Sequence, residues 1–283
     1  MTQLNDKLAA KIAEAAKTGP NMNESQSGGG GTYTLPEEGI ARARLVGYYE
    51  VGEHEKKYEG KVIGYKPYVE LVFELSGPKH PPIKAADGTE YPQRMTVREM
   101  LSLSEKAHFF KLFTQLNYAG DVTHAAQLLG RAFLVRVYHY DSTHDGKTTK
   151  KASLRGKSGY QITGPKVQDP LSGDFIDVPV EPPKSELKAF IWNLADMEDW
   201  KAIHIDGWYE EPKEGKPGRS KNVIQEKIMR AKNWPKHPLY AQLRAGGAAA
   251  DIPEPTTPAR DEAKNEAAEA NKATGDDPLA GIA

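Results

Sequence analysis

Regular alternation between Tyr65 and Leu75 constrains the fold of this chain more than any other feature of its sequence. The inward positions are Val69, Leu71, Phe73 and Leu75, and the opposite positions are Tyr68, Glu70, Val72 and Glu74. Successive side chains of a β-strand point to opposite faces, so this pattern predicts a strand buried on one side. Ile40–Val51 predicts a second strand, with Ala41, Ala43, Leu45, Tyr49 and Val51 inward and Arg42, Arg44, Val46 and Tyr48 outward.

The order of the remaining predicted elements is that of a small barrel. Strands are predicted at Tyr91–Met100, Arg131–Tyr140, Lys147–Lys157 and Gly159–Val167, and helices at Ser104–Gly120 and Thr123–Leu129. Ser104 has the chemistry of an N-cap, and Asp145-Gly146 is typical of a hairpin turn. Three strands, a helix and two more strands are the order of an OB-fold. We therefore expect a mainly β chain with some helix, built around a five-stranded antiparallel OB-fold-like barrel.

Composition divides the chain into four segments. These are an N-terminal helix with a flexible Gly-rich linker (1–32), an OB-fold-like nucleic-acid-binding domain (33–180), a Trp-rich helical appendage (181–244) and a disordered acidic tail (245–283). The appendage holds all four tryptophans and two helical patterns, Ser185–Leu194 and Ser220–Lys232, and Val178–Pro183 predicts a linker in front of it. The tail is too poor in apolar residues to form a core.

Composition also excludes several classes of protein. The chain has no cysteine, which excludes disulfides, thiolate nucleophiles and Cys-ligated zinc. No apolar run approaches the roughly 18–20 residues of a membrane span, and charges occur throughout the first 19 residues, which argues against a secretory signal. We therefore expect a cytoplasmic protein without a membrane anchor.

Charge is distributed unevenly along the chain. Between Arg131 and Tyr160, seven Lys or Arg residues face two Asp and are interspersed with Phe133, Tyr138 and Tyr140. Residues 251–283 reverse the sign, with eight acids against three bases and no aromatic ring. Cations neutralise phosphates and rings stack on bases, so a basic aromatic β surface beside an acidic tail is typical of proteins that bind single-stranded nucleic acid. The alternative is a solvated edge strand whose lysines prevent aggregation.

The same alternation places further cations and rings on polar strand faces. Arg42, Arg44, Arg94 and Arg98 lie opposite the apolar faces, so several strands are expected to present cations together. Tyr48, Tyr68, Tyr138 and Tyr140 also occupy polar positions, where a stacked base contributes roughly 1–3 kcal/mol per ring. Packing between neighbouring strands is the alternative role for each tyrosine.

No pattern predicts catalysis, a metal site or a cofactor. The spacing of His139 and His144 matches no helical or finger-type ligand set, and nothing fixes the convergence of carboxylates that a nuclease requires. Gly156-Lys157-Ser158 resembles the end of a phosphate-binding loop, but Lys151 stands where the motif requires its first glycine. We therefore expect a protein without enzymatic activity.

Three segments carry a resemblance to a known family. Gly39–Glu55, Tyr68–Leu75 and Leu128–His139 are similar to bacteriophage-encoded single-stranded DNA-binding proteins. The resemblance implies a barrel that coats unwound DNA in phage replication, and hence a location in the host cytoplasm. It implies phosphate contacts from Arg42, Arg44, Arg94, Arg98, Arg136, Lys147, Lys150, Lys151, Arg155 and Lys157, and stacking on Tyr48, Tyr138 and Tyr140.

The resemblance also implies a role for the tail. An acidic C-terminus, here with Asp276 and Asp277, would recruit polymerase, helicase or recombination proteins. Tails of this kind commonly end in an aromatic residue, whereas this sequence finishes in Ala283. Recruitment by the tail is therefore a weaker expectation than DNA binding, and oligomeric state is left open.

The sequence therefore predicts sequence-independent binding of single-stranded DNA in phage replication and recombination. One alternative is a protein-interaction or virion structural protein with an OB-like barrel that does not bind DNA. A metal-dependent nuclease is a third hypothesis.

Overall fold

The computed structural model describes residues 35–84, 88–144, 146–213 and 218–245, except for the side chains of His144 and Lys147. The predicted N-terminal helix, its Gly-rich linker and residues 246–283 of the acidic tail lie outside the described residues. Every helix among the described residues is too short or too polar to cross a membrane.

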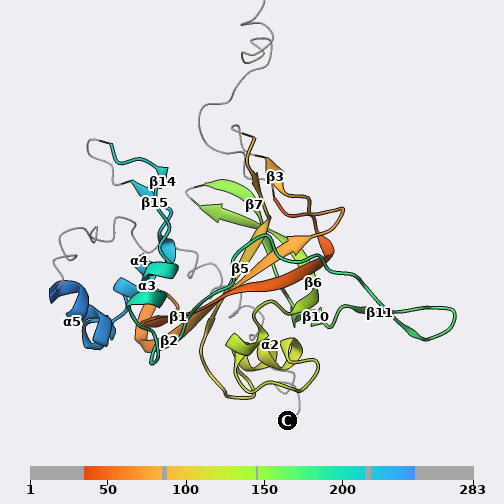
Figure 1. Ribbon diagram of the computed structural model, residues 1–283, viewed down its shortest axis with the longest axis horizontal. Coiled ribbons are helices and arrows are strands. Elements are labelled where there is room, and N and C mark those ends of the chain that lie inside the picture. Colours follow the sequence, from red (N-terminus) through yellow and green to blue (C-terminus); the bar gives the residue numbers. More distant parts are fainter. Residues whose placement is uncertain (1–34, 85–87, 145, 214–217, 246–283) are drawn as a thin grey trace, which may run out of the picture. The chain divides into compact units, whose positions relative to one another are not determined.

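A long hairpin of two strands forms the centre of the structure (Figure 1). Strand β1 (Gly39–Tyr58) pairs antiparallel with β2 (Lys61–Ser76). The pairing passes from Leu45 opposite Phe73 to Gly47 opposite Val72, so Val46 is an extra residue in β1. Such a β-bulge moves the side chains that follow it to the other face. Beyond Val46 the predicted faces of β1 are therefore exchanged.

Five further strands complete the main sheet. They are β5 (Arg94–Met100), β6 (Ala132–His144), β7 (Lys147–Ser153), β10 (Ile162–Thr163) and β13 (Lys188–Phe190). The order is β10-β6-β1-β2-β5, with β7 also paired to β6 and β13 paired parallel to β1. The prediction of a mainly β chain is confirmed. The predicted barrel is wrong, because the described sheet remains open, with β10 and β5 unpaired with each other at the two ends of the strand order. Beyond the point where β6 leaves β1, β13 pairs with β1.

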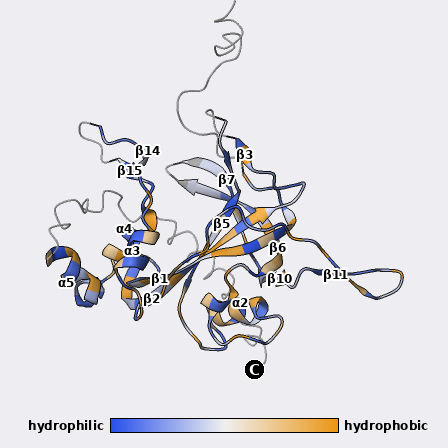
Figure 2. Ribbon diagram, in the orientation of Figure 1, coloured by the Kyte–Doolittle hydropathy of each residue, from blue (hydrophilic) through white to orange (hydrophobic). Residues whose placement is uncertain are grey.

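One face of the sheet packs on two short helices. These are α2 (His108–Leu116) and the 3₁₀ helix η1 (Ala125–Leu128), which are shorter than the predicted helices. Ser104 closes a turn by accepting a hydrogen bond from the Ala107 N–H and does not cap α2. Figure 2 shows hydrophobic residues recurring along β1 and β2 and within α2. The buried cluster between these elements includes Leu71, Phe73 and Phe133.

The opposite face packs on the C-terminal module, which we define as residues 188–245. It contains β13, α3 (Met197–Ala202), β14 (Trp208–Glu210), β15 (Arg219–Ser220), α4 (Val223–Met229), η2 (Trp234–Lys236) and α5 (Pro238–Ala245). The Trp200 and Trp234 rings stack with centroids 5.1 Å apart. The second cluster also contains Tyr49 and Val51 of β1, which the bulge turns toward the module. The predicted helix Ser185–Leu194 is wrong, because β13 lies within it.

In sequence, a segment that we call the strap (residues 178–187) comes just before this module. It follows the hairpin of β11 (Lys166–Gln168) and β12 (Phe175–Asp177) and leads into β13. The Arg44 guanidinium donates to the carbonyl oxygens of Val180 and Glu181, at 2.7 and 2.6 Å. The Glu74 carboxylate accepts from the backbone N–H groups of Lys184 and Ser185, at 2.6 and 2.8 Å. The predicted linker is therefore pinned across the sheet.

Three small hairpins complete the described fold. They are β3 (Ile83–Lys84) with β4 (Glu90–Tyr91), β8 (Arg155–Gly156) with β9 (Gly159–Tyr160), and β11 with β12. The predicted strand Lys147–Lys157 thus divides into β7 and β8, and Gly159–Val167 divides into β9, β10 and the start of β11.

Candidate nucleic-acid interface

Pairing between four strands brings several predicted residues onto one face. Directly opposed residues of antiparallel strands share a face, and so do alternate residues of one strand. The register opposes Tyr140 to Lys151, Tyr138 to Ser153, Arg136 to Ile40, Leu134 to Arg42, and Arg42 to Ser76. We call the resulting set the outer ladder: Lys151, Tyr140, Tyr138, Arg136, Ile40 and Arg42.

The outer ladder combines cations with partly exposed rings. The Arg136 side chain is exposed, with its guanidinium carbon 5.9 Å from the centroid of the Tyr138 ring. Tyr138, Tyr140 and Lys151 are half-buried. A Cβ atom at Gly156 would approach the Tyr138 ring to 2.7 Å, so only glycine lets the ring lie against the β8–β9 hairpin. The fold therefore fixes one side of this ring and leaves part of it in solvent.

Ile40 is a member of the ladder that the site prediction missed. Its side chain is 61% exposed, although it is a large apolar residue on a central strand. The sequence contained enough to place it there, because Ile40 and Arg42 are alternate residues of one strand and therefore share a face. Exposed apolar surface between cations can contact the faces of bases or sugars.

Arg44 lies on the same face but is covered by the strap. Besides its two strap contacts, it donates from Nη1 to the Gly130 carbonyl oxygen at 2.7 Å. Three carbonyl oxygens thus hold this guanidinium between β1, the strap and the loop before β6. These contacts favour a structural role for Arg44, and its phosphate contact stays a prediction.

Arg98 is also covered. Its Nε lies 3.8 Å from the Glu70 carboxylate, which is 1% exposed, and its guanidinium lies over the Tyr68 ring at 4.6 Å. Lys227 of α4 donates to the same carboxylate at 2.7 Å. A buried carboxylate requires such partners, so Arg98 is part of the contact between sheet and module, and its phosphate contact stays a prediction.

The covered part of the sheet also shifts the pKa of a histidine, His54. Burial, followed by the nearby Arg98 charge, lowers the pKa of His54 to about 4. His54 Nε2 lies 2.9 Å from the Val51 carbonyl oxygen, and the His54 ring packs edge-on to Tyr68. The histidine is therefore neutral near pH 7, and its position between sheet and module favours a structural role.

Arg155 is directed away from the outer ladder. Its Nη2 lies 2.7 Å from His108 Nε2 on α2, and its Nη1 lies 3.4 Å from the Glu99 carboxylate. Burial lowers the pKa of His108, with Arg155 as a second cause, which favours the neutral ring that can accept this hydrogen bond. Glu99 also accepts from the Tyr160 hydroxyl at 2.6 Å. This internal network favours a structural role for Arg155, and its phosphate contact stays a prediction.

Tyr48 belongs to the core. The bulge at Val46 turns its ring to the inner face, where it is 1% exposed. Its hydroxyl donates to Glu50 at 2.9 Å, and burial raises its pKa far above the ordinary value. A base cannot reach this ring in the folded chain, so the predicted stacking role is wrong.

The remaining predicted residues are scattered. Arg94 is exposed on the face of the ladder, but it lies on β5 opposite Glu74, beyond the strap. Lys150 is exposed on the other face of the β6–β7 hairpin, opposite Asp141, and Lys157 is exposed between β8 and β9. The Lys147 side chain, Asp276 and Asp277 lie outside the described residues.

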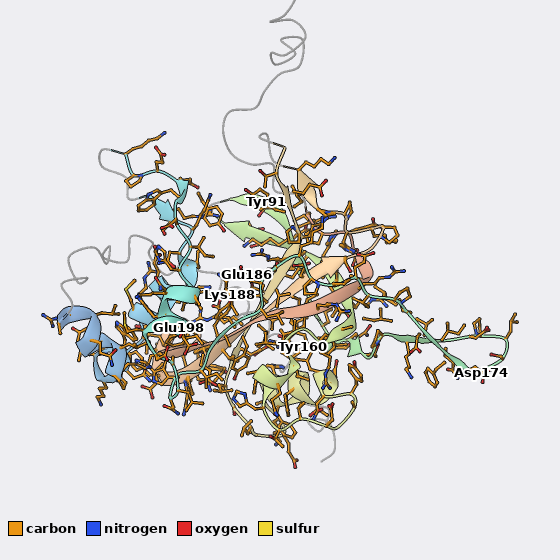
Figure 3. All side chains as sticks on the ribbon, in the orientation of Figure 1. Tyr91, Tyr160, Asp174, Glu186, Lys188 and Glu198 are labelled. Carbon is orange, nitrogen blue, oxygen red and sulfur yellow. The ribbon has the colours of Figure 1, made fainter. Side chains whose placement is uncertain are left out.

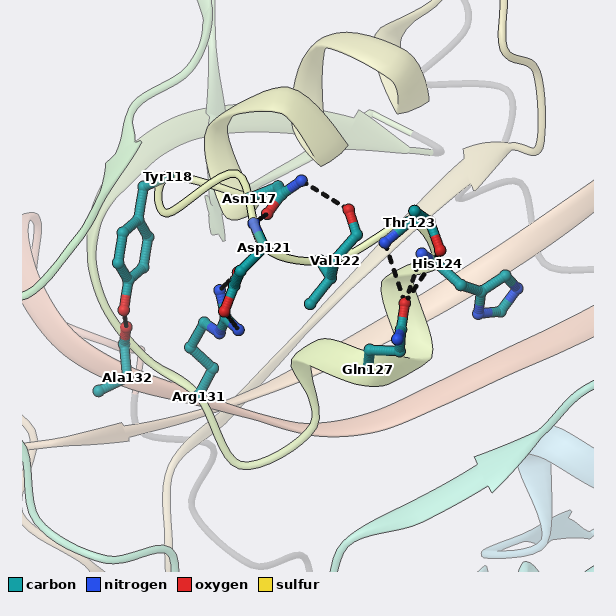
Figure 4. A network of polar contacts seen from close by, with 9 residues as sticks. All are labelled: Asn117, Tyr118, Asp121, Val122, Thr123, His124, Gln127, Arg131 and Ala132. Atoms are coloured by element: carbon teal, nitrogen blue, oxygen red, sulfur yellow. Dashed lines mark hydrogen bonds and ion pairs between the residues drawn. The ribbon is translucent and has the colours of Figure 1, made fainter.

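One of the seven cations counted in the basic segment is neutralised locally. Arg131 binds Asp121 through both guanidinium ends, at 2.6 and 2.8 Å (Figure 4). The hydrogen bond to Arg131 lowers the pKa of Asp121. Beside this pair, Gln127 accepts from the Thr123 and His124 backbone N–H groups and closes the cap of η1. A count of Lys and Arg residues in this segment therefore overstates the number of cations available to a ligand.

Two further observations bear on chemistry and ancestry. Among the described residues, no group of three His, Asp or Glu side chains is arranged to hold a metal ion. No protein-family model, curated protein or solved structure matches this chain. A functional assignment must therefore rest on the arrangement of the residues themselves.

Proposed function

We propose that this chain binds single-stranded nucleic acid along the outer ladder, without sequence preference and without a catalytic step. The supporting observation is that Arg42, Arg136 and Lys151 share one sheet face with Tyr138 and Tyr140. Cations bind the backbone and rings stack on unpaired bases, which gives affinity with little base readout.

The spacing of the ladder suits an extended strand. Arg136, Tyr138 and Tyr140 are alternate residues of β6 and follow one another at about 6.7 Å, twice the rise per strand residue. The neighbouring strands place Ile40 and Lys151 about 4.8 Å to either side of β6. A strand lying along β6 would therefore meet a cation and then two rings in succession.

We also propose that the sheet is an opened relative of the OB-fold. The order β1, β2, β5, α2, β6 and β7 along the chain is that of an OB-fold. In the described sheet β10 and β5 lie at the two ends of the strand order and do not pair with each other, whereas a closed barrel would join them. On the family resemblance alone, we place the activity in phage DNA replication and recombination in the host cytoplasm, with partner recruitment by the tail.

Titration of the full chain with labelled single- and double-stranded oligonucleotides over a salt series tests the proposal. Three ladder cations on three phosphates predict a log–log salt slope of about −2 for single strands, since each phosphate contributes about −0.7. Weaker binding of the duplex is expected, because paired bases cannot stack on the tyrosines. A flat salt response, or no preference for single strands, would contradict the proposal.

A matched pair of variants locates the site. Lys151→Gln on the ladder should weaken binding and flatten the salt slope by about 0.7. Lys111→Gln removes the same charge from the exposed side of α2, on the other side of the sheet, and should leave binding unchanged. Equal effects of the two variants would assign binding to net charge and not to the ladder.

One observation favours a second function, protein interaction. The β11–β12 hairpin exposes Val167, Leu171, Phe175 and Ile176, with Leu171 96% exposed, and Figure 3 labels Asp174 near its end. An isolated two-stranded hairpin is marginally stable in water, so a partner protein would stabilise it. Sedimentation of the wild-type chain and Phe175→Ser, with and without oligonucleotide, separates the functions. Loss of self-association without loss of DNA binding would assign the hairpin to proteins.

A further inference from the structure

A shallow pocket lies at the Arg42 end of the outer ladder. It has a volume of about 250 Å³ and lies between the start of β1 and the turn that follows β2. Its lining residues include Arg42, Ser76, Gly77 and Lys79, and the Lys79 ammonium is already paired with Glu37 at 2.9 Å. The pocket is small for an organic ligand but large enough for a phosphate group.

A carboxylate of the strap already contacts two of these residues. Glu181 Oε2 accepts from the Gly77 backbone N–H at 3.2 Å, and Glu181 Oε1 lies 3.9 Å from Arg42 Nη1. Both distances exceed the roughly 2.7–2.9 Å of a strong charge-assisted hydrogen bond. The Glu181 side chain is 59% exposed. The carboxylate is therefore held loosely and can leave.

The pocket also contains an unsatisfied donor. The Ser76 Oγ is buried and has no hydrogen-bond partner among the described residues. Gly77 has a φ of +95°, a conformation that favours glycine, and its N–H donates to the Glu181 carboxylate. Leaving a buried hydroxyl unpaired is unfavourable, so an additional acceptor in the pocket would stabilise it.

We propose that this pocket binds one phosphate of a single strand, and that the Glu181 carboxylate engages two of its donors, Gly77 and Arg42, as an internal substitute when no strand is bound. The inference rests on the proposed function and deepens it. A phosphate has more acceptor oxygens than a carboxylate, so one group can accept from Arg42, Gly77 and Ser76 together. Nucleic acid and Glu181 then compete for the same donors.

The surrounding contacts allow this exchange without unfolding the strap. Arg44 holds the strap through the main-chain carbonyls of Val180 and Glu181, and Glu74 holds it through two backbone N–H groups. None of these contacts uses the Glu181 carboxylate. Rotation of one exposed side chain is therefore sufficient to vacate the pocket, and a strand following the ladder past Arg136 and Ile40 arrives there.

Oligonucleotide titration of Glu181→Gln tests the competition. Removing the competing charge should tighten binding of a single-stranded oligonucleotide about two- to fivefold at low salt, the scale of one exposed ion pair. Glu186→Gln is the matched control, because Glu186 lies five residues further along and pairs only with Lys188, at 3.7 Å, among the described residues (Figure 3). The control should not change affinity.

A double-variant cycle identifies the donor. In an Arg42→Gln background, Glu181→Gln should have a smaller effect, because only the Gly77 N–H remains as a donor shared by Glu181 and the phosphate. If Glu181→Gln and Glu186→Gln change affinity equally, or if the effect of Glu181→Gln is undiminished without Arg42, the inference is overturned while DNA binding by the ladder stands.

The Gly77 amide resonance gives a readout that does not depend on DNA. In Glu181→Gln, inorganic phosphate should shift this resonance saturably, with a Kd on the order of 1–10 mM, and more weakly in the wild-type chain. Absence of any shift overturns the phosphate pocket. If no variant binds oligonucleotides but the shift occurs, the proposed function fails and the pocket remains an anion site.

Discussion

Two regions of the same sheet face carry arginines in the same alternating pattern and use them differently. On the outer ladder, Arg136 is exposed and Arg42 has one loose partner among the described residues. Beneath the strap and the C-terminal module, Arg44 and Arg98 are bound to carbonyl and carboxylate oxygens of the chain itself. The position of a residue in the alternating pattern of a strand therefore decides on which face its side chain lies. The segments that pack over that face decide whether a cation there can contact a ligand.

Among the variants that test this comparison, Arg44→Ala should have the largest effect, on the free energy of unfolding. It removes three hydrogen bonds from a charged group and releases the strap, so the free energy of unfolding should fall by roughly 2–4 kcal/mol. Arg136→Ala, on the exposed ladder, should change it by less than about 0.5 kcal/mol. Urea unfolding followed by circular dichroism measures both. Similar losses in the two variants would remove the distinction between the covered and exposed regions.

Acid should weaken the covered region through His54. Its pKa is lowered in the folded chain to about 4, so the unfolded state binds the proton more readily. The stability contribution of neutral His54 is complete above the ordinary histidine pKa of about 6.5 and is lost as pH falls toward 4, by about 2–3 kcal/mol. Unfolding measured at pH 7, 5.5 and 4.5 should show this loss. A His54→Gln chain should lack that part of the pH dependence.

Tyr138→Ala tests whether an exposed ring of the outer ladder contributes to the affinity for single strands. Loss of one stacking ring is expected to weaken single-strand affinity by about 1–3 kcal/mol. Tyr91→Ala provides the control, since Tyr91 is a 52% exposed tyrosine on β4, outside the ladder. Fluorescence titration at one salt concentration measures both. An equal loss in Tyr91→Ala would show that any exposed ring suffices.

Arg136→Gln is expected to have the smallest effect. It removes one phosphate contact and should reduce the magnitude of the log–log salt slope by about 0.7. Lys111→Gln, which removes the same charge on the other side of the sheet, should give no such change. An unchanged slope in Arg136→Gln would exclude Arg136 from the interface.

Local sequence patterns predicted most of the strands and part of the candidate site. Alternation in β2 and β6 identified the core positions Val69, Leu71, Phe73 and Phe133, all buried in one cluster. It failed in β1 beyond Leu45, because a single extra residue at Val46 exchanges the two faces and buries Tyr48. A bulge is set by the partner strand and by what packs on each face, and one strand's sequence contains neither.

The sequence by itself determined that this chain is mainly β, that its strands place cations and tyrosines on polar faces, and that it has no thiol chemistry. Tertiary structure alone decided that the sheet stays open, that the strap covers Arg44, and that Arg155 turns inward to Glu99 and His108. The physical reason is the distance along the chain over which each property is decided. The alternation of side chains depends on the backbone of neighbouring residues. Whether an arginine is covered depends on carbonyl and carboxylate oxygens more than 50 residues away in the sequence, which accept its hydrogen bonds.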